Sequence, residues 1–587
     1  MAEALRIANC SGFYGDRLSA AREMVEGGPI DVLTGDYLAE LTLMILLKDR
    51  MKDPRLGYAR TFIQQLEQVA TTCKERGIKI VVNAGGLNPA GLADAVRELY
   101  RKLGLEAVVA QLEGDDLLPQ LDELQANGVS LAHLHKDIPL RSLGAPVLSA
   151  NAYLGAWGIV TALERGADLV ICPRVTDAAL ALGPAAWKFG WARDDWDRLA
   201  AGVVAGHIIE CGAQCTGGNY AFFREVADLR APGFPIVEIG ADGSFVVTKH
   251  PGTGGLVSVG TVTAQLLYEI AGPAYLNPDV TTHFDSIRLS QEGPDRVRVS
   301  GIKGTPPPAT TKVCINHLGG YRNSMTFVLT GLDIEEKARL AQETFLALVG
   351  GREQFAEVQV SLDRSPPPNP ARNEDAFAHL TIAVKDPDAA KVGRAFSGKA
   401  VEMALASYPG FFITSPPSRE SQFGVYWPAL VPSDLIEERV VIDDAVIPVP
   451  PPAVPSSTSV APPATRALPG KPPGGPTREQ PLGSICGARS GDKGGNANLG
   501  VWVRTPDAYH WLADFLSVER LRALLPEARE LEVERYELPN LLALNFVLKG
   551  LLGDGVAASL RPDPQAKSLG EYLRAKIVPI PDVLLEN

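Results

Sequence analysis

Short apolar runs recur through the N-terminal part of the chain, and each ends in Gly, Asn, Asp or Ser. They include "LRIANCSGFYGD", "PIDVLTGDYLAE", "IKIVVNAGGLNPAG", "LEAVVAQLEGDD" and "ADLVICPRVTDAA", with helical patterns such as "RTFIQQLEQVATTCKERG" between several of them. This alternation predicts a largely parallel sheet covered by helices. In open α/β sheets ligands bind beyond the carboxyl ends of the strands, so the polar residues there are the first candidates for a site.

The pattern changes beyond about residue 240. Segments such as "GSFVVTKH", "DRVRVSGIKG", "SMTFVLTGL" and "HLTIAVKD" alternate like half-buried strands, and one clear helix, "IEEKARLAQETFLALVG", interrupts them. Runs of strands with segregated helices favour an α+β arrangement. We therefore expect one large unit over residues 1–445, with a parallel α/β part over about 1–235 and an α+β subdomain over about 236–445.

A proline-rich stretch follows this unit. Between Pro448 and Pro481, twelve of 34 residues are proline. Proline fixes φ and has no N–H to donate, so the sequence predicts an extended linker over residues 446–482. Residues 483–587 then read as strand, glycine-rich loop, strand and helix, followed by further strands and a last helix, which predicts a small α/β unit with its own core.

The overall composition indicates an ordinary soluble globular protein. Of the 587 residues, 45% are hydrophobic and 21% charged, and the net charge of −13 argues against nucleic-acid or anionic-membrane partners. Seven cysteines without framework spacing, no secretory apolar segment and no long apolar run predict a cytoplasmic protein. We also expect it to self-associate as a homo-oligomer.

The stretch "ARSGDKGGNAN" is a candidate anion-binding loop at the start of the small unit. Arg489 and Lys493 supply positive charge, Gly494 and Gly495 permit close approach of backbone N–H groups, and Asn496 adds an amide. A phosphate or a carboxylate is the natural ligand. The alternative is a long hairpin tip on which a neighbouring aspartate pairs with the two cations in solvent.

Two further motifs allow both a functional and a structural interpretation. In "CPRVTDAAL", Arg174 at a strand end should pair with a carboxylate of the protein or of a ligand, whereas Asp177 is either a site residue or an ordinary helix cap. In "HIIECGAQCTGGNYAFF", Cys215 is either a nucleophile or a small buried hydrophobe.

Several known site types are excluded by their missing motifs. The chain has no GxSxG elbow, no GxGxxG dinucleotide fingerprint after a first strand, no Walker loop and no zinc-binding Cys/His spacing. We therefore expect no metal and no nicotinamide cofactor.

Seven motifs, in this order, resemble those of the acyclic terpene utilisation (AtuA) family. They are "RIANCSGFYGDR", "VVNAGGLNP", "SANAYLGAWGIV", "CPRVTDAAL", "ECGAQCTGGNY", "HPGTGGLV" and "SICGARSGDKGGNANLGVWV". The resemblance implies an AtuA core domain up to about residue 445 and a small C-terminal domain with a ferredoxin-like fold. It also implies a role in the catabolism of acyclic terpenes such as citronellol and geraniol, which proceeds through branched acyl-CoA thioesters.

If the substrate is an acyl-CoA or a related carboxylate, an anion-binding loop and a polar cleft at the strand ends serve complementary purposes. Hydratase or lyase chemistry on such a thioester needs an acid/base carboxylate and donors for the enolate oxygen. CoA would then be part of the substrate, and no further cofactor is expected. The candidates at strand ends are Asp16, Asp36, Asp177, Asn83, Gly85, Gly86 and Asn151.

Two other interpretations stay open at this point. The first is a non-catalytic scaffold or subunit that binds acyl-CoA and delivers it to a partner enzyme. The second is an enzyme that uses Cys215 or Cys211 as nucleophile for acyl or CoA transfer.

Overall fold

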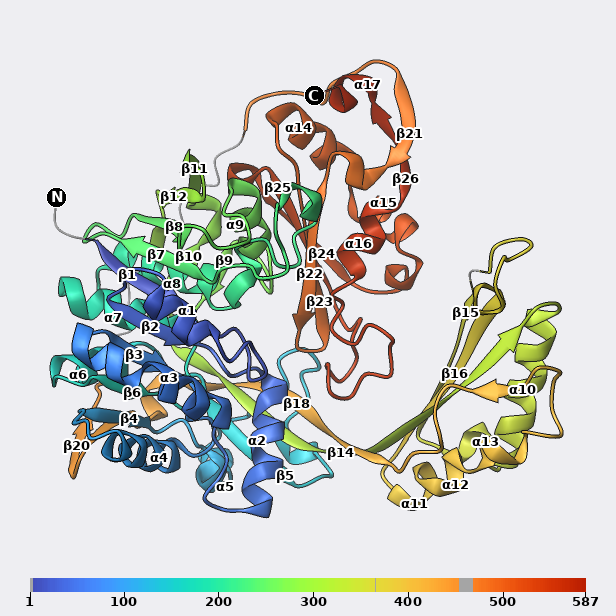
Figure 1. The fold of residues 1–587 in the computed structure, drawn as a ribbon, viewed down its shortest axis with the longest axis horizontal. Coiled ribbons are helices and arrows are strands. Elements are labelled where there is room, and N and C mark those ends of the chain that lie inside the picture. The colour runs from blue at the N-terminus through green and yellow to red at the C-terminus, as the bar shows by residue number, and fades with distance from the viewer. Residues whose placement is uncertain (1–3, 365, 453–467, 587) are drawn as a thin grey trace.

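A computed structural model describes residues 4–364, 366–452 and 468–586. Its centre is a set of five parallel strands that lie in the order β1, β2, β3, β6, β4 (Figure 1). The strands are β1 (Leu5–Asn9), β2 (Val32–Gly35), β3 (Lys79–Val82), β4 (Val109–Glu113) and β6 (Leu169–Ile171). The predicted parallel α/β core is confirmed, and its strand ends share one edge of the sheet.

Helices cover both faces of these strands and form two separate apolar cores. One core includes α1 (Ala20–Glu26), α3 (Arg60–Arg76) and α4 (Pro89–Lys102); the other includes α6 (Trp157–Glu164), α7 (Ala179–Phe189) and α8 (Trp196–Ile209). Helix α3 illustrates how such a helix packs on the sheet. Its apolar residues Phe62, Leu66, Val69 and Cys73 recur every three or four positions, so they lie on one face of the helix and are buried. The helix ends at Gly77, whose φ of +67° suits glycine best.

Antiparallel strands extend the sheet beyond both edges of the parallel set, to eleven strands in all. On the β1 side lie β7 (Pro235–Ile239), β8 (Phe245–Lys249), β12 (Arg296–Ser300) and β11 (Arg288–Gly293); on the β4 side lie β19 (Arg439–Ile442) and β20 (Ala445–Pro448). The expected division near residue 235 therefore does not separate two layers, because β7, β8, β11 and β12 continue the first sheet, whereas β9 (Ala274–Leu276) and β10 (Thr281–His283) form a small sheet with β13 (Lys303–Thr305).

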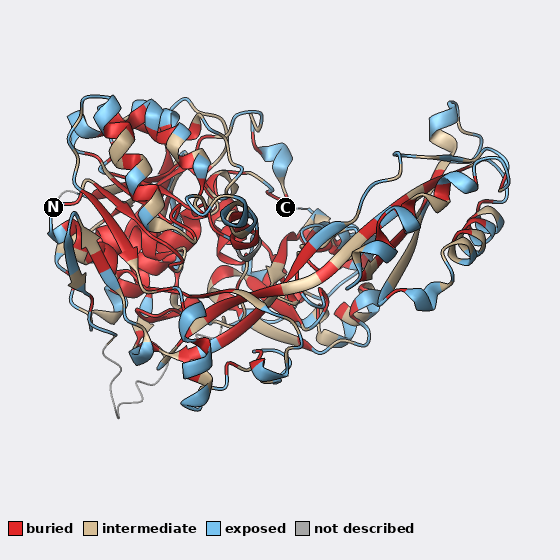
Figure 2. Cartoon of the chain, turned by 90° about the horizontal axis from the view of Figure 1, so that it is seen from below, coloured by how far each residue is buried: buried red, intermediate tan, exposed pale blue. Residues whose placement is uncertain are grey.

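A second sheet carries an arm that projects from the body of the molecule (Figure 1). Its longest strand, β14 (Thr310–Thr330), pairs near the body with β5 (Val147–Ala152) and β18 (Ser421–Pro432), and further out with β16 (Phe377–Asp386). We call the outer half of β14, together with β15 (Glu357–Arg364), β16 and α10 to α13, the arm. Figure 2 shows buried residues along the long strands out into the arm.

The arm has an apolar core of its own, in which Phe345 of α10 (Ile334–Leu348) packs against Phe327 and Phe396. The other short helices are α11 (Ala389–Val392), α12 (Arg394–Ser397) and α13 (Lys399–Glu402). The α+β texture predicted for the region after residue 240 is thus found, but it belongs to the arm and not to the whole range 236–445.

The C-terminal domain is a four-stranded antiparallel sheet with helices. The strands lie in the order β22 (Gly487–Lys493), β23 (Asn496–Trp502), β25 (Ala543–Leu548) and β24 (Val533–Leu538), with α14 (Pro506–Phe515), α15 (Val518–Leu524) and α16 (Leu569–Arg574). The domain begins earlier than predicted, because β21 (Thr477–Pro481) pairs with β26 (Ile577–Pro581). Of the predicted linker, residues 453–467 lie outside the described residues.

The C-terminal domain docks onto the loop that follows α9 (Val259–Leu266). Asn498 accepts a hydrogen bond from the backbone N–H of Glu269, and Asn545 donates to the carbonyl oxygen of Ile270. Gly500 lies so close to Leu267 that a Cβ atom at Gly500 would come within 2.5 Å of the Leu267 Cβ. Two buried amides and a tight glycine contact thus fix the domain on the body.

None of the helices in the described ranges combines the length and the apolar character that crossing a bilayer requires.

The close approach at Gly500 predicts a measurable cost for added volume there. Gly500→Ala should destabilise the protein by about 1–3 kcal/mol, because the new methyl group overpacks the contact with Leu267. The control is Gly144→Ala, since a Cβ at Gly144 meets no atom within 4 Å. Equal thermal unfolding midpoints for the two variants would contradict this tight docking.

Candidate functional site

Asp36 and Asn83 directly follow two neighbouring parallel strands, β2 and β3, and are in contact. Asn83 Nδ2 donates to Asp36 Oδ1 at 2.6 Å, and Asn83 Oδ1 accepts from the backbone N–H of Tyr37 at 2.7 Å. Asp36 is 5% exposed and also accepts from the N–H of Leu38. Asn83 therefore positions the carboxyl group of Asp36.

Arg174, which comes after the end of β6, lies in the middle of this edge. Its side chain is buried, forms an ion pair with Asp177 at 3.0 Å, and donates to the carbonyl oxygen of Leu38 at 2.9 Å. Its guanidinium also lies over the ring of Tyr153, 4.2 Å from the ring centre. The expected carboxylate partner is thus Asp177. The helix-cap alternative for Asp177 is wrong, because Ala178 is the N-cap of α7.

Glu210 and His207 at the end of α8 extend the cluster, although neither is among the predicted site residues. Their Oε1 and Nδ1 atoms are 3.3 Å apart and both side chains are buried. Glu210 Oε2 has no hydrogen-bond partner among the described residues. The signal in the sequence is a His and a Glu three positions apart, but only the fold brings this helix end to the strand ends.

Burial and like charge change the protonation of these groups. The pKa of Asp36 is raised well above its usual value by burial, with the negative charges of Asp177 and Glu210 adding to the effect. The pKa of Glu210 is raised for the same reasons, burial first and Asp177 next. Burial lowers the pKa of His207 to about 4. Glu210, a buried carboxyl group with a raised pKa, therefore lies beside an imidazole that is neutral at pH 7.

Asp115, beyond the end of β4, connects this edge with the second sheet. It accepts hydrogen bonds from Asn151 Nδ2 at 2.8 Å and from the backbone N–H of Arg174 at 3.3 Å. Burial raises the pKa of Asp115 to about 7. Asn151 Oδ1 is buried without a hydrogen-bond partner in the described residues. Asn151 is thus at the predicted edge, but it reaches it from β5 in the other sheet.

The glycine-rich stretch of the C-terminal domain is a tight hairpin, so the predicted backbone anion loop is wrong. Only Gly494 and Gly495 form the tip; Lys493 and Asn496 already face each other across the strands. Pairing between the strands uses the backbone groups that an anion nest would need. Asn496 accepts from the N–H of Gly550 and contacts His135, and therefore fastens the hairpin in place.

The two cations of this hairpin nevertheless point into the domain interface and not into solvent. Lys493 Nζ donates to the carbonyl oxygen of Glu269 at 2.6 Å, and its charge acts on both His207 and Glu210. Arg489 is 7% exposed and lies over the ring of Tyr268 at 4.3 Å.

One hydrogen-bond donor of the Arg489 guanidinium has no acceptor among the described residues. Its Nη1 donates to the carbonyl oxygen of Asn219 at 3.4 Å, but its buried Nη2 has no hydrogen-bond partner among the described residues. A buried guanidinium donor without a partner is uncommon, and a bound anion or water is the usual explanation.

Other predicted residues do not fit their expected roles. Asp16 accepts hydrogen bonds from the backbone N–H groups of Gly12 and Arg17, so it shapes the loop after β1. The N–H groups of Gly85 and Gly86 already donate to the carbonyl oxygens of Cys172 and Asn83, and cannot serve an enolate oxygen without losing those bonds.

Cys215 is fully buried in an apolar core, and burial raises the pKa of its thiol. A nucleophilic cysteine needs a thiolate, which this environment disfavours. The structural interpretation of Cys215 is the better one.

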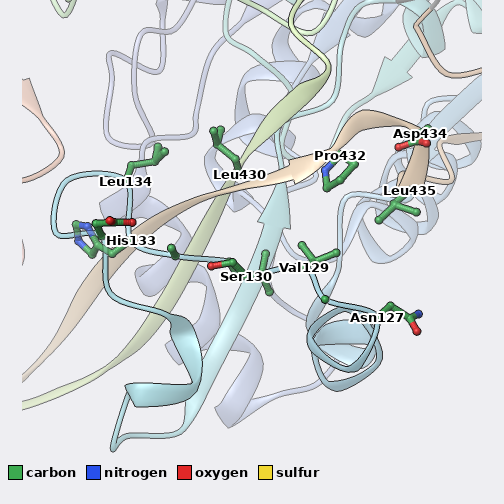
Figure 3. Close-up of a pocket in the computed structure, with 13 residues that line it drawn as sticks. Asn127, Val129, Ser130, His133, Leu134, Leu430, Pro432, Asp434 and Leu435 are labelled. Atoms are coloured by element: carbon green, nitrogen blue, oxygen red, sulfur yellow. The ribbon is translucent and has the colours of Figure 1, made fainter.

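The structure also has a surface hollow of about 660 Å³ (Figure 3). Residues of segments 127–134 and 430–435 line it, among them His133 and Leu430. None of the predicted site residues belongs to its lining. Over the described ranges, no three His, Cys, Asp or Glu side chains are placed to hold a metal ion together.

Two family models match the chain. Residues 5–442 match the acyclic terpene utilisation family protein AtuA, and residues 480–579 match the AtuA ferredoxin-like domain. No curated protein matches the sequence.

The raised pKa of Glu210 predicts a pH dependence of stability. The native state keeps this proton to a higher pH than the unfolded chain, so stability falls as the pH rises from about 4.5 toward the raised pKa. Glu210→Gln should weaken this fall, by about 1.4 kcal/mol for each unit of pKa shift that it removes.

The measurement is urea unfolding of both proteins at pH 5 and pH 8, with exposed Glu336→Gln as the control. If the Glu210 variant loses as much stability between the two pH values as the wild type does, Glu210 is not protonated in the native state.

Proposed function

The chain belongs to the acyclic terpene utilisation family AtuA, and we propose that it is an enzyme acting on a branched acyl-CoA or related carboxylated intermediate. The proposed chemistry is of the hydratase or lyase type, with acid and base groups at the carboxyl edge of the parallel strands. The C-terminal domain supplies the cations that hold the anionic substrate.

One observation carries this proposal. Three carboxyl groups, of Asp36, Asp177 and Glu210, surround Arg174, and the pKa values of Asp36 and Glu210 are raised well above the ordinary range. Perturbed acids that gather at strand ends are a common property of catalytic sites. Structural ion pairs can also perturb pKa values. A carboxyl group with only a structural role is expected to have both oxygens hydrogen-bonded, whereas Glu210 Oε2 has no hydrogen-bond partner among the described residues.

Hydration of an enoyl thioester needs one group that accepts a proton and one that gives one. The base takes a proton from water as the water oxygen bonds to C3, and the acid delivers a proton to C2. In the lyase reaction of a 3-hydroxyacyl thioester the base removes the hydroxyl proton, the C2–C3 bond breaks to leave a carbonyl at C3 and an enolate at C2, and the acid protonates C2. We assign the acid role to Glu210 or Asp36, whose pKa values are raised, and the base role to Asp177. Arg174 and Lys493 would stabilise the negative charge that develops on the thioester oxygen.

The buried Nη2 atom of Arg489 supports an anionic substrate. A carboxylate or phosphate oxygen within hydrogen-bond distance would satisfy this donor, and charged hydrogen bonds of this type contribute about 1.5–3 kcal/mol each. The ligand is therefore a small acidic molecule, in keeping with an acyl-CoA or a free dicarboxylate.

The cysteines support a cytoplasmic location. None of the seven takes part in a disulfide in the described part of the chain, which is typical of a reducing compartment.

The acid and base roles predict loss of turnover without loss of fold. Asp177→Asn and Glu210→Gln should each lower kcat by about 10²-fold or more on a panel of branched enoyl-CoA and 3-hydroxyacyl-CoA esters. The control is Asp242→Asn, in the turn between β7 and β8. Mass spectrometry of the products measures turnover. Unchanged rates in the first two variants would remove these carboxyl groups from the mechanism.

The role of Arg489 predicts a loss of binding that is separate from turnover. Arg489→Met should weaken the binding of acyl-CoA esters about tenfold or more, because the charged hydrogen bond is lost. Arg520→Met, on the surface of α15, is the control. Calorimetry on each variant measures the affinity. Wild-type protein that binds these esters but turns over none of the panel would favour the scaffold interpretation over the enzyme.

A further inference from the structure

The arm ends in an edge strand whose outer side is uncovered. In the described part of the chain, β16 is the only strand that pairs with β15. The carbonyl of Val358 accepts a hydrogen bond from the side chain of Arg352, which indicates that the backbone groups of even-numbered residues point away from β16. Those of Val360 and Leu362 then face outward. Exposed edges of this length usually carry proline or inward charges as protection, and "EVQVSLDR" has neither in its centre.

The inner face of β15 is also only half covered. Val360 and Leu362 pack at the rim of the arm's core and, with Leu380, form the floor of a hollow of about 540 Å³ beside α10. Ala338 and Arg339 of α10 stand on one side of it. A strand that joins the outer edge of β15 would place its own inward side chains next to this apolar floor.

We propose that this edge pairs with β15 of a second copy of the chain, antiparallel, with Ser361 on the twofold axis. In this register Val360 faces Leu362 of the other copy on the inner face. Gln359 faces Asp363 on the outer face, where an amide and a carboxylate can bond. Opposed residues point to the same side, so the two hollows merge between the α10 helices of both copies.

Charge disfavours the register shifted by one residue toward the start of β15. With Val360 on the axis instead, Glu357 would face Asp363 of the other copy at both ends, and like charges directly opposite destabilise a strand pair. With Ser361 on the axis, no two like charges are opposed within the eight residues of β15. An isologous contact of this kind closes as a dimer.

The position of the arm allows the contact. The arm projects from the body, and β15 lies on it apart from the parallel sheet (Figure 1), while Lys385, the ion-pair partner of Glu357, contacts Ala558 of the C-terminal domain. Two copies can therefore join at β15 without disturbing the candidate site. This inference is independent of the proposed function.

Substitutions at Ser361 test the register directly. Ser361 is half-buried on the outer face of the arm sheet. Ser361→Lys or Ser361→Glu places two like charges opposite each other, and each variant alone should be monomeric by light scattering at concentrations where the wild type is a dimer. An equal mixture of the two variants should restore the dimer, because opposite charges then meet. Circular dichroism and thermal unfolding of each variant monitor the fold.

A cysteine pair provides the second measurement. Opposed residues in a non-hydrogen-bonded antiparallel pair lie about 4.5 Å apart at Cα, within disulfide range. Ser361→Cys should therefore form a covalent dimer on mild oxidation, whereas the matched control Gln359→Cys should not. A monomeric wild type, a dimer that persists in the Ser361→Lys variant, or equal cross-linking of both cysteine variants would each overturn the proposal.

Discussion

The buried guanidinium of Arg174 is the interaction on which the candidate site depends. Charged groups are costly to bury unless they are paired and hydrogen-bonded. Arg174 meets that condition with Asp177, the carbonyl oxygen of Leu38 and the ring of Tyr153, while its backbone N–H binds Asp115. Through these contacts of its side chain and its backbone N–H, one residue ties together the segments that follow β2, β4 and β6. Its positive charge also moderates the repulsion among the carboxyl groups around it.

The C-terminal domain completes this arrangement from outside. Its hairpin enters as a rigid two-stranded unit, and Asn498 and Asn545 fix it on the loop after α9. The same docking brings Lys493 to the carbonyl of Glu269 and Arg489 to the ring of Tyr268. The charge of Lys493 from this separate domain thus acts on Glu210 of the body, so an anionic ligand between them would contact both domains. A site of this kind exists only while the domains stay docked.

The arm is built on a different principle. Its core of phenylalanines is separate from the two cores of the body, and the long strand β14 connects them. Strand β5 pairs with the inner half of the same β14 and presents Asn151 to Asp115. The second sheet therefore has two ends with different roles: one supports the strand-end cluster, and the other exposes the edge of β15. Contacts at the arm leave the cluster chemically undisturbed because the cores are not shared.

The sequence by itself determined the family, the parallel strands and the polar residues directly after them, because apolar runs and strand-end turns are local patterns. Asp36, Asn83, Arg174 and Asp177 follow from that pattern and do meet at one edge. What only the tertiary structure decided depends on contacts between distant segments.

Glu210 and His207 come from the end of a helix, and Asp115 meets Asn151 across two sheets. The glycine stretch after residue 488 became a hairpin tip and not an anion loop, since its neighbours paired as strands. Local pattern cannot distinguish a strand that pairs from a loop that binds, because the pairing partner lies elsewhere in the chain.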